Sequence, residues 1–209
     1  VRGRYDKAAH AVIFKTTHFS KYVVAYNKVK FKDVEDNSWY SEAIGFIAAR
    51  EITTGTGNGC FCPEDKLTRG EFIVMMMRAY GIEPYAGHTD NFADAGNTYY
   101  SGYLAAGKKL GIAGGIGNNL FAPDKEITRQ EMFTLLHRAL KVLGELPEGA
   151  AGKIPAGFSD RDSIAKYAEE AMAMFVQTGI ISGSNGMLAP EAAATRAQMA
   201  QILYRLLSK

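Results

Sequence analysis

Three segments of the chain share one spacing of apolar residues, the i, i+3, i+4, i+7 pattern of a helix with one buried face. Directly before each stripe stands Thr-x-x-Glu or Thr-x-x-Gln, the capping-box sequence that begins a helix. We therefore expect helices to begin at Thr68, Thr128 and Thr195, and their three apolar faces to bury one another in a three-helix core. The apolar positions are Phe72, Met75, Met76 and Ala79; Met132, Leu135, Leu136 and Ala139; and Met199, Ile202, Leu203 and Leu206.

These helices are the last parts of three copies of a longer repeat. Upstream of each Thr lie a Phe-x-Pro or Leu-x-Pro segment, a Gly-rich turn and a Phe-x-Asp segment, always in this order. The Phe-x-Asp segments begin at Phe31, Phe92 and Phe158, so successive copies are offset by 61 and 66 residues. Each copy should also contain a first helix, ended by the glycines that follow it. The expected ranges are Ser38 to Arg50, Tyr99 to Leu110 and Ile164 to Gln177.

The repeat divides the chain into four segments. Residues 31–87, 88–152 and 153–209 are the three repeats, and residues 1–30 do not match them. Ala11 to Tyr26 is rich in β-branched and aromatic residues, which predicts one or two strands. We interpret residues 1–30 as the end of a preceding β-rich domain or a linker. The predicted fold class is mainly α, with three helix-loop-helix repeats and a short N-terminal β segment.

Composition and motifs exclude several classes of function. The formal net charge of +2 favours neither a nucleic-acid partner nor a membrane surface, and no run of about eighteen apolar residues predicts a membrane span. Cys60 and Cys62 alone cannot complete a tetrahedral zinc site, so they are either small loop residues or, as the alternative, include a catalytic thiol. The histidines are scattered and no catalytic motif occurs. We expect no metal, no cofactor and no enzyme activity in this chain, although an enzyme domain N-terminal to it is compatible with this interpretation.

Arg69, Arg129 and Arg196 follow the three capping threonines and occupy the first helical position. The helix dipole disfavours a cation there by about 0.3–1 kcal/mol. Each arginine is therefore an idle remnant of shared ancestry, the partner of a nearby carboxylate, or part of an anion site. A guanidinium beside free N–H groups of a helix start suits a carboxylate or phosphate, and we favour this third interpretation. It requires that the protein's own acids leave the guanidinium groups unoccupied.

Three further sets of residues complete the predicted binding site. Aspartates supply acceptors, aromatic side chains supply platforms, and glycines in the turns supply backbone N–H groups, the usual equipment for holding a sugar. The alternative for the aspartates is a turn or cap before the first helix, and the alternative for the aromatic residues is core packing. An acidic polysaccharide is the simplest ligand that uses all these parts. The residues are Asp33, Asp94 and Asp160; Trp39, Tyr99 and Tyr167; and Gly55, Gly115 and Gly183.

With these motifs the sequence resembles the S-layer homology family over residues 31–209. The shared segments read "FKDVEDNSWYSEAI" and "FCPEDKLTRGE", "FADAGNTYYSGYL" and "LFAPDKEITRQE", and "FSDRDSIAKYAEEAM" and "LAPEAAATRAQ". The resemblance implies a pseudo-threefold unit with a central three-helix bundle and grooves between the copies. It also implies an extracellular, non-catalytic anchor on a bacterial cell wall. Its ligand would be a secondary cell-wall polysaccharide, often with pyruvylated N-acetylmannosamine, whose ketal carboxylate would meet Arg69, Arg129 and Arg196.

The third copy departs most from the family pattern. It has Leu188 for Phe, Ala194 for Ile and Gln198 for Glu, and its glycine turn is one residue shorter. The groove that depends on this copy is therefore the weakest candidate for binding. The competing interpretation of the whole unit is self-association, in which the repeats form lattice or subunit contacts of a surface layer rather than bind a glycan.

Overall fold

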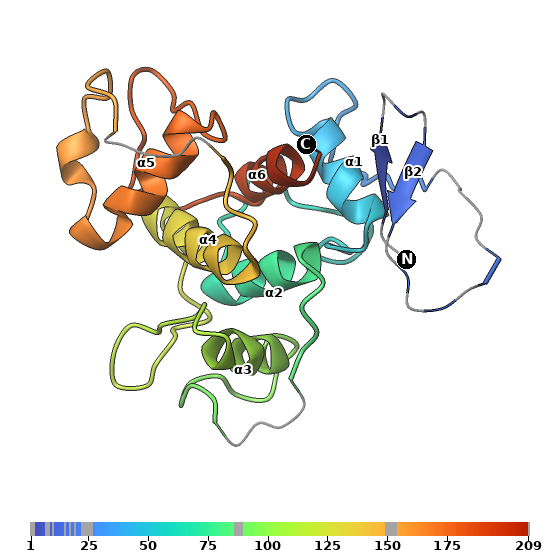
Figure 1. Ribbon diagram of the computed structural model, residues 1–209, viewed down its shortest axis with the longest axis horizontal. Coiled ribbons are helices and arrows are strands. Elements are labelled where there is room, and N and C mark those ends of the chain that lie inside the picture. The colour runs from blue at the N-terminus through green and yellow to red at the C-terminus, as the bar shows by residue number, and fades with distance from the viewer. Residues whose placement is uncertain are drawn as a thin grey trace.

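The computed structural model describes residues 3–6, 9, 11–14, 16, 18, 20–21, 27–85, 90–148 and 154–208. It is mainly helical, as predicted (Figure 1). No helix in these ranges combines the length and the apolar character that crossing a membrane needs. The elements are β1 (Gly3–Asp6), β2 (Ala11–Phe14), α1 (Ser41–Ala49), α2 (Arg69–Ala79), α3 (Ser101–Lys109), α4 (Arg129–Leu143), the 3-10 turns η1 (Arg161–Ser163) and η2 (Lys166–Ala168), α5 (Glu169–Gln177) and α6 (Arg196–Leu207).

The six α-helices form a ring of three repeats. The second helices α2, α4 and α6 lie at the centre, and the first helices α1, α3 and α5 lie outside them (Figure 1). The helix α3 packs on α2, α5 packs on α4, and α1 packs on α6. Each first helix thus rests on the second helix of the preceding repeat, and the first repeat rests on the third. This confirms the predicted pseudo-threefold unit with a central three-helix bundle.

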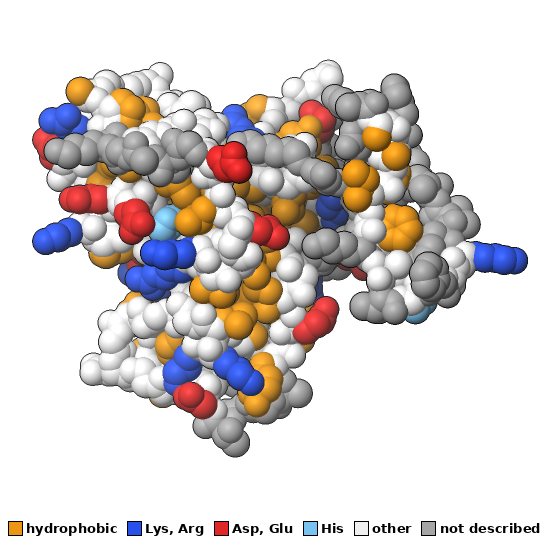
Figure 2. Space-filling view, in the orientation of Figure 1, with side chains coloured by type: hydrophobic (Ala, Val, Ile, Leu, Met, Phe, Trp, Pro, Cys, Tyr) orange, Lys and Arg blue, Asp and Glu red, His pale blue; other side chains and the backbone are white. Residues whose placement is uncertain are grey.

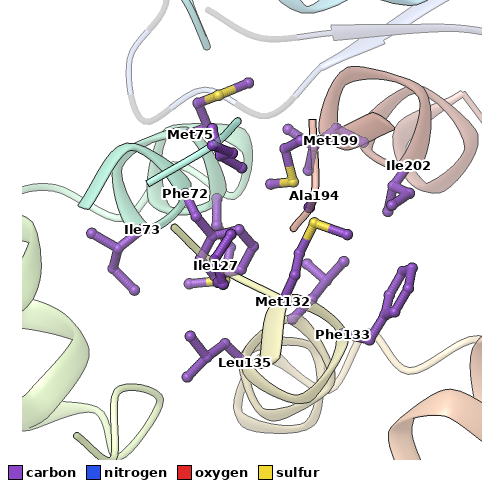
Figure 3. Packing of buried hydrophobic residues seen from close by; sticks show 14 of the residues in the cluster. Phe72, Ile73, Met75, Ile127, Met132, Phe133, Leu135, Ala194, Met199 and Ile202 are labelled. Carbon is purple, nitrogen blue, oxygen red and sulfur yellow. The ribbon is translucent and has the colours of Figure 1, made fainter. Parts of the chain in front are cut away.

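The predicted apolar stripes converge on the centre of this unit. Phe72, Met132 and Met199, at the equivalent position of the three central helices, are fully buried and face one another (Figure 3). Burying a side chain of this size contributes about 1.5–3 kcal/mol relative to leaving it exposed. Leu206 is the exception among the stripe residues, because it is only partly buried at the end of α6.

A ring of three backbone hydrogen bonds closes the unit just before the central helices. The N–H of Leu67 donates to the carbonyl oxygen of Ala194, Ala194 donates to Ile127, and Ile127 donates back to Leu67, each at 2.9 Å. All three residues are fully buried, so water does not compete for these bonds. Each repeat thus completes its backbone hydrogen bonding only through the other two.

All three predicted helix starts are confirmed. Thr68, Thr128 and Thr195 accept a hydrogen bond from the backbone N–H three residues on. The side chains of Glu71, Glu131 and Gln198 return a bond to the N–H of their threonine, which completes each capping box. Loss of one threonine hydroxyl is expected to cost about 1 kcal/mol.

The first helices are shorter than the sequence predicted. The helices α1 and α3 begin at Ser41 and Ser101, after turns that hold the preceding aromatic residues. In the third repeat the extended backbone of Ile164 separates η1 from η2, so α5 begins only at Glu169. Glycine ends the first helix in two repeats only, since Glu51 takes the left-handed conformation in the first, with φ of 58°.

The N-terminal prediction of strands is confirmed in part. Residues Ala11–Phe14 form β2, which pairs antiparallel with β1, a strand that the sequence analysis did not single out. Residues 16, 18, 20 and 21 are not in a strand, and residues 22–26 of the same stretch lie outside the described residues.

Candidate functional site

The motif arginines join the repeats to one another. The Nε atom of each arginine donates to a backbone carbonyl oxygen in the Phe-x-Pro or Leu-x-Pro segment of the following repeat, with the first repeat following the third. The pairs are Arg69 with Phe121, Arg129 with Leu188 and Arg196 with Phe61, each at 2.8 Å. We name the three places the Arg69, Arg129 and Arg196 junctions.

The N–H groups at the helix starts are not free, which corrects one premise of the sequence analysis. The N–H of Arg69 donates to the carbonyl oxygen of Lys125 at 2.9 Å, and the N–H of Gly70 donates to Pro123 at 2.8 Å. The N–H of Glu71 donates to the capping threonine. The same pattern holds at the starts of α4 and α6. The following repeat therefore occupies the donors that we had assigned to an anion.

Two of the three arginines also have an acidic partner within the protein. Arg69 Nη1 lies 3.2 Å from Glu131 Oε1, and Arg196 Nη1 lies 2.8 Å from Glu71 Oε1. Both arginines are buried, with 3% and 4% of their surface exposed. The requirement that the protein's own acids leave the guanidinium groups unoccupied is therefore wrong for these two junctions. These arginines hold repeats together, and the glutamates serve both the capping box and the ion pair.

The Arg129 junction differs in each of these respects. Arg129 is only partly buried, and its Nη1 donates to Gln198 Oε1 at 3.3 Å, so it has an amide partner where the others have a carboxylate. The Arg69 and Arg196 guanidinium groups lie over the rings of Phe121 and Phe61, at 4.5 and 4.8 Å from the ring centroids. At the corresponding place Arg129 has Leu188, which has no ring, and its guanidinium lies instead over the ring of Phe133, at 5.6 Å from the ring centroid.

The predicted aromatic platforms lie on the surface, so the core-packing alternative for them is wrong. Trp39, Tyr99 and Tyr167 are 59%, 62% and 54% exposed. Burial and the nearby carboxylate of Glu131 raise the pKa of Tyr167, and burial with Glu71 raises the pKa of Tyr99.

Two of the aromatic platforms lie in electrostatic range of a junction. Arg69 and Glu131 both influence the pKa of Tyr167, and Arg196 and Glu71 influence that of Tyr99. Trp39 precedes α1, which packs on α6, so the threefold arrangement of the repeats predicts that Trp39 lies near the Arg129 junction.

The aspartates of the Phe-x-Asp segments hold the loop of their own repeat. The carboxylate of Asp33 accepts the N–H groups of Phe61 and Cys62 at 2.8 and 2.7 Å. Asp94 and Asp160 do the same in their repeats. Burial opposes ionisation of Asp33, but these hydrogen bonds outweigh it and lower its pKa. The three aspartates lie in turns before the first helices, as the alternative interpretation stated, but no side chain caps those helix starts. Their place in ligand binding stays a prediction.

The turn glycines are required by the backbone and by close packing. Gly55, Gly115 and Gly183 have φ of 81°, 69° and 68°, a region that costs other residues about 1 kcal/mol or more. A Cβ on Gly115 would lie 2.6 Å from the carbonyl oxygen of Leu120 and 2.9 Å from the ring of Phe92. The ring of the Phe-x-Asp segment thus packs directly on the turn. Their predicted role in ligand binding is untested.

Gly115→Ala is expected to lower the free energy of unfolding by about 2–4 kcal/mol, because backbone strain and overpacking act together. Gly144→Ala is the matched control, since Gly144 has φ of 70° with nothing within 4 Å of its built Cβ. That variant should lose only about 1 kcal/mol. Urea denaturation of both variants measures the difference, and equal losses would show that the contact with Leu120 and Phe92 is unimportant.

In the described part of the chain, no group of three or more His, Cys, Asp or Glu side chains could hold a metal ion. Cys60 and Cys62 are free and partly buried in the loop, and the Sγ of Cys62 lies 3.1 Å from the hydroxyl of Thr56. The small-residue interpretation of the two cysteines accounts for these contacts.

Comparison with known protein families identifies the repeat. The model described as the S-layer homology domain matches residues 30–73, 91–133 and 157–200, together more than half of the chain. The chain belongs to the S-layer homology family. This membership makes it a non-catalytic anchoring module of the cell surface, associated with the cell wall.

Several relatives contain this S-layer homology unit as a small part of a longer protein. The chain is 35% identical, over its whole length, to 11% of an amylopullulanase of Thermoanaerobacterium thermosulfurigenes. It is 34% identical over 87% of its length to 16% of the exoglucanase XynX of Acetivibrio thermocellus. It is also 28% identical over 84% of its length to 21% of the S-layer protein sap of Bacillus anthracis. The chain thus spans between about a tenth and a fifth of these relatives.

The acceptors of the arginines in this S-layer homology unit were not predicted from the sequence. No sequence motif marks the carbonyl oxygens of Phe61, Phe121 and Leu188 as acceptors. The glutamates Glu71 and Glu131 could have been predicted as partners, because a capping box uses only one carboxylate oxygen and leaves the other for a cation.

Proposed function

We propose that this S-layer homology unit holds the protein that contains it on the cell wall by binding an anionic secondary cell-wall polysaccharide at the junctions between repeats. The acidic group of the glycan, such as a pyruvate ketal carboxylate, meets a motif arginine, and a sugar ring lies on the neighbouring aromatic side chain. The observation that carries the proposal is that Trp39, Tyr99 and Tyr167, at equivalent positions of the three repeats, are all more than half exposed.

Two of the three exposed rings are held in position by a neighbouring ring. Trp39 and Tyr99 each contact the following tyrosine edge to face, with ring centroids 5.2 and 5.1 Å apart. Aromatic side chains bury large apolar areas when a partner covers them, so leaving three of them in water at equivalent positions is costly without a ligand. A flat ring that is held in this way suits the apolar face of a sugar.

The distribution of charge supports a localised anion site rather than a broad basic surface. Lys and Arg side chains are interspersed with Asp and Glu on the face shown in Figure 2. Attraction of a long polyanion through unspecific charge would need a patch of one sign. A guanidinium near an aromatic ring offers a directed contact with one carboxylate instead.

The relatives support attachment as the task of the shared segment. The relatives are named as an amylopullulanase, an exoglucanase and an S-layer protein, yet all three share the same segment with this chain. A segment shared by proteins of such different names is better explained by a common location than by a common reaction.

Sedimentation with purified cell walls tests the proposal. The chain should sediment with native walls and not with walls from which the secondary polysaccharide has been removed. The double variant Trp39→Ala and Tyr99→Ala should lose most of this binding and should lower the free energy of unfolding only slightly, since both rings are more than half exposed. Tyr85→Ala is the control, because Tyr85 is also exposed, at 43%, but belongs to none of the three junctions.

Self-association is the second candidate, because one relative is named an S-layer protein. In that case the chain would sediment with native and stripped walls alike and would form oligomers in solution. This outcome, together with normal sedimentation of the double variant, would overturn the glycan proposal.

A further inference from the structure

We propose that the three junctions are not equivalent and that the Arg129 junction is the one that takes the acidic group of the ligand. This inference rests on the proposed function and adds to it the residues that decide where the acid binds. It also reverses the sequence-based expectation that the groove depending on the third copy is the weakest, because the substitutions of that copy are what distinguish the junction.

The difference begins with the single acceptor oxygen of Gln198. In the other two junctions a carboxylate uses Oε2 for its capping threonine, at 2.9 Å, and Oε1 for the arginine. An amide has only one oxygen, and Gln198 Oε1 accepts both the N–H of Thr195 and Nη1 of Arg129, each at 3.3 Å. Arg129 is therefore held less firmly and its charge is not neutralised by this partner.

The Arg129 junction also offers donors that the others lack. The orientation of Gln198 is fixed by its two donating neighbours, so its Nε2 group points its N–H bonds elsewhere. Within the described residues no protein acceptor engages Gln198 Nε2 or Arg129 Nη2, and no buried side-chain nitrogen there lacks a hydrogen bond. These two groups are consequently in reach of solvent. An amide N–H beside a guanidinium N–H suits a carboxylate.

An incoming carboxylate would meet a like charge at the other two junctions. Glu71 and Glu131 lie directly on Arg196 and Arg69, and like charges brought together at an interface cost several kcal/mol. Asp160 lies in electrostatic range of Arg129, as Asp94 does of Arg69, so the aspartates do not distinguish the junctions.

One further charge ranks the two remaining junctions. Lys125 Nζ is 4.0 Å from Glu131 Oε1 and is 59% exposed, so it offsets Glu131 only weakly. Among the described residues no lysine forms a salt bridge with Glu71. The Arg196 junction is therefore the least favourable of the three for an acidic ligand.

Calorimetric titration with a disaccharide that contains pyruvylated N-acetylmannosamine tests the inference, with the disaccharide lacking the pyruvyl group as the matched ligand. Gln198→Glu gives the Arg129 junction the carboxylate that the other two have, so its fold should be retained. Its affinity for the pyruvylated disaccharide should fall at least about tenfold, and its affinity for the uncharged one should change little. The control Gln177→Glu adds the same charge at an exposed position of α5, outside the three junctions, and should change neither affinity.

The outcomes separate this inference from the function on which it rests. If Gln198→Glu binds the pyruvylated disaccharide as the unaltered chain does, the inference is overturned and wall anchoring stands. The same holds if the unaltered chain sediments with native walls but does not distinguish the two disaccharides. If the unaltered chain binds neither native walls nor disaccharide, the proposed function fails and the inference with it.

Discussion

A fragment that ends at residue 148, and so lacks the third repeat, will not fold cooperatively. In the intact unit Phe46 on α1 packs against Tyr204 on α6, with ring centroids 5.0 Å apart. Phe133 on α4 packs against Phe175 on α5, with ring centroids 5.3 Å apart. Both contacts disappear in the fragment. The helix α1 of the first repeat then lacks α6, the helix against which it packs. Repeat proteins bury their apolar faces only between neighbours, and in a closed ring every repeat needs two.

The backbone hydrogen bonds lead to the same expectation. Without Ala194, the buried N–H of Leu67 has no acceptor and the buried carbonyl of Ile127 has no donor, and each unsatisfied group costs about 1–3 kcal/mol. Circular dichroism and urea titration of fragment 27–148 should show no cooperative transition, whereas residues 27–208 should unfold in one. Addition of the separate segment 154–208 should restore the transition. A sharp transition of the fragment alone would contradict the closed ring.

Arg196→Met should lower the free energy of unfolding by about 3 kcal/mol. Arg196 connects the third repeat to the first through Glu71 and through the carbonyl oxygen of Phe61. Removing one partner of a buried ion pair leaves the other charge uncompensated and costs about 3–5 kcal/mol. We expect the lower end of this range, because 26% of the Glu71 side chain is exposed and water screens it in part.

Arg129→Met is the control for this measurement, since its partner is a neutral amide. Its loss should be about 1–2 kcal/mol, the usual result of leaving partly buried hydrogen-bonding groups without a partner. Urea denaturation of the two variants gives the comparison directly. Equal losses, or a larger loss for Arg129→Met, would show that the carboxylate of Glu71 does not set the stability of its junction.

The sequence predicted the central helices correctly because their signals are local. A capping box and an apolar stripe lie within one helix, and Thr68, Thr128 and Thr195 begin their helices as expected. The first helices were overestimated for a local reason too. Their starts have no side-chain cap, so nothing in the sequence marks where the preceding turn ends.

The role of the arginines could not be read from one repeat. Arg69 is 62 residues away from Glu131 in the sequence, and only the closed ring brings them within 3.2 Å of each other. The sequence analysis weighed a nearby carboxylate as a partner but had no reason to choose one in the next repeat.

The aspartates show a similar limit. Asp33 lies 28 residues before Phe61 and accepts a hydrogen bond from its backbone N–H. The recurrence of Phe-x-Asp in the three repeats does not reveal which backbone groups of a loop point toward the aspartate. For the aromatic residues the sequence left core packing open as the alternative, and the exposure of Trp39, Tyr99 and Tyr167 decides against it.

The number of disaccharides bound by one chain tests the account most directly. Calorimetric titration of the unaltered chain with the pyruvylated disaccharide measures this stoichiometry. Among the described residues, Arg69 and Arg196 each form an ion pair with a glutamate, whereas Arg129 contacts the amide of Gln198 instead. We therefore expect one equivalent to bind tightly. Three equal sites, or tight binding that survives Arg129→Met, would contradict the account.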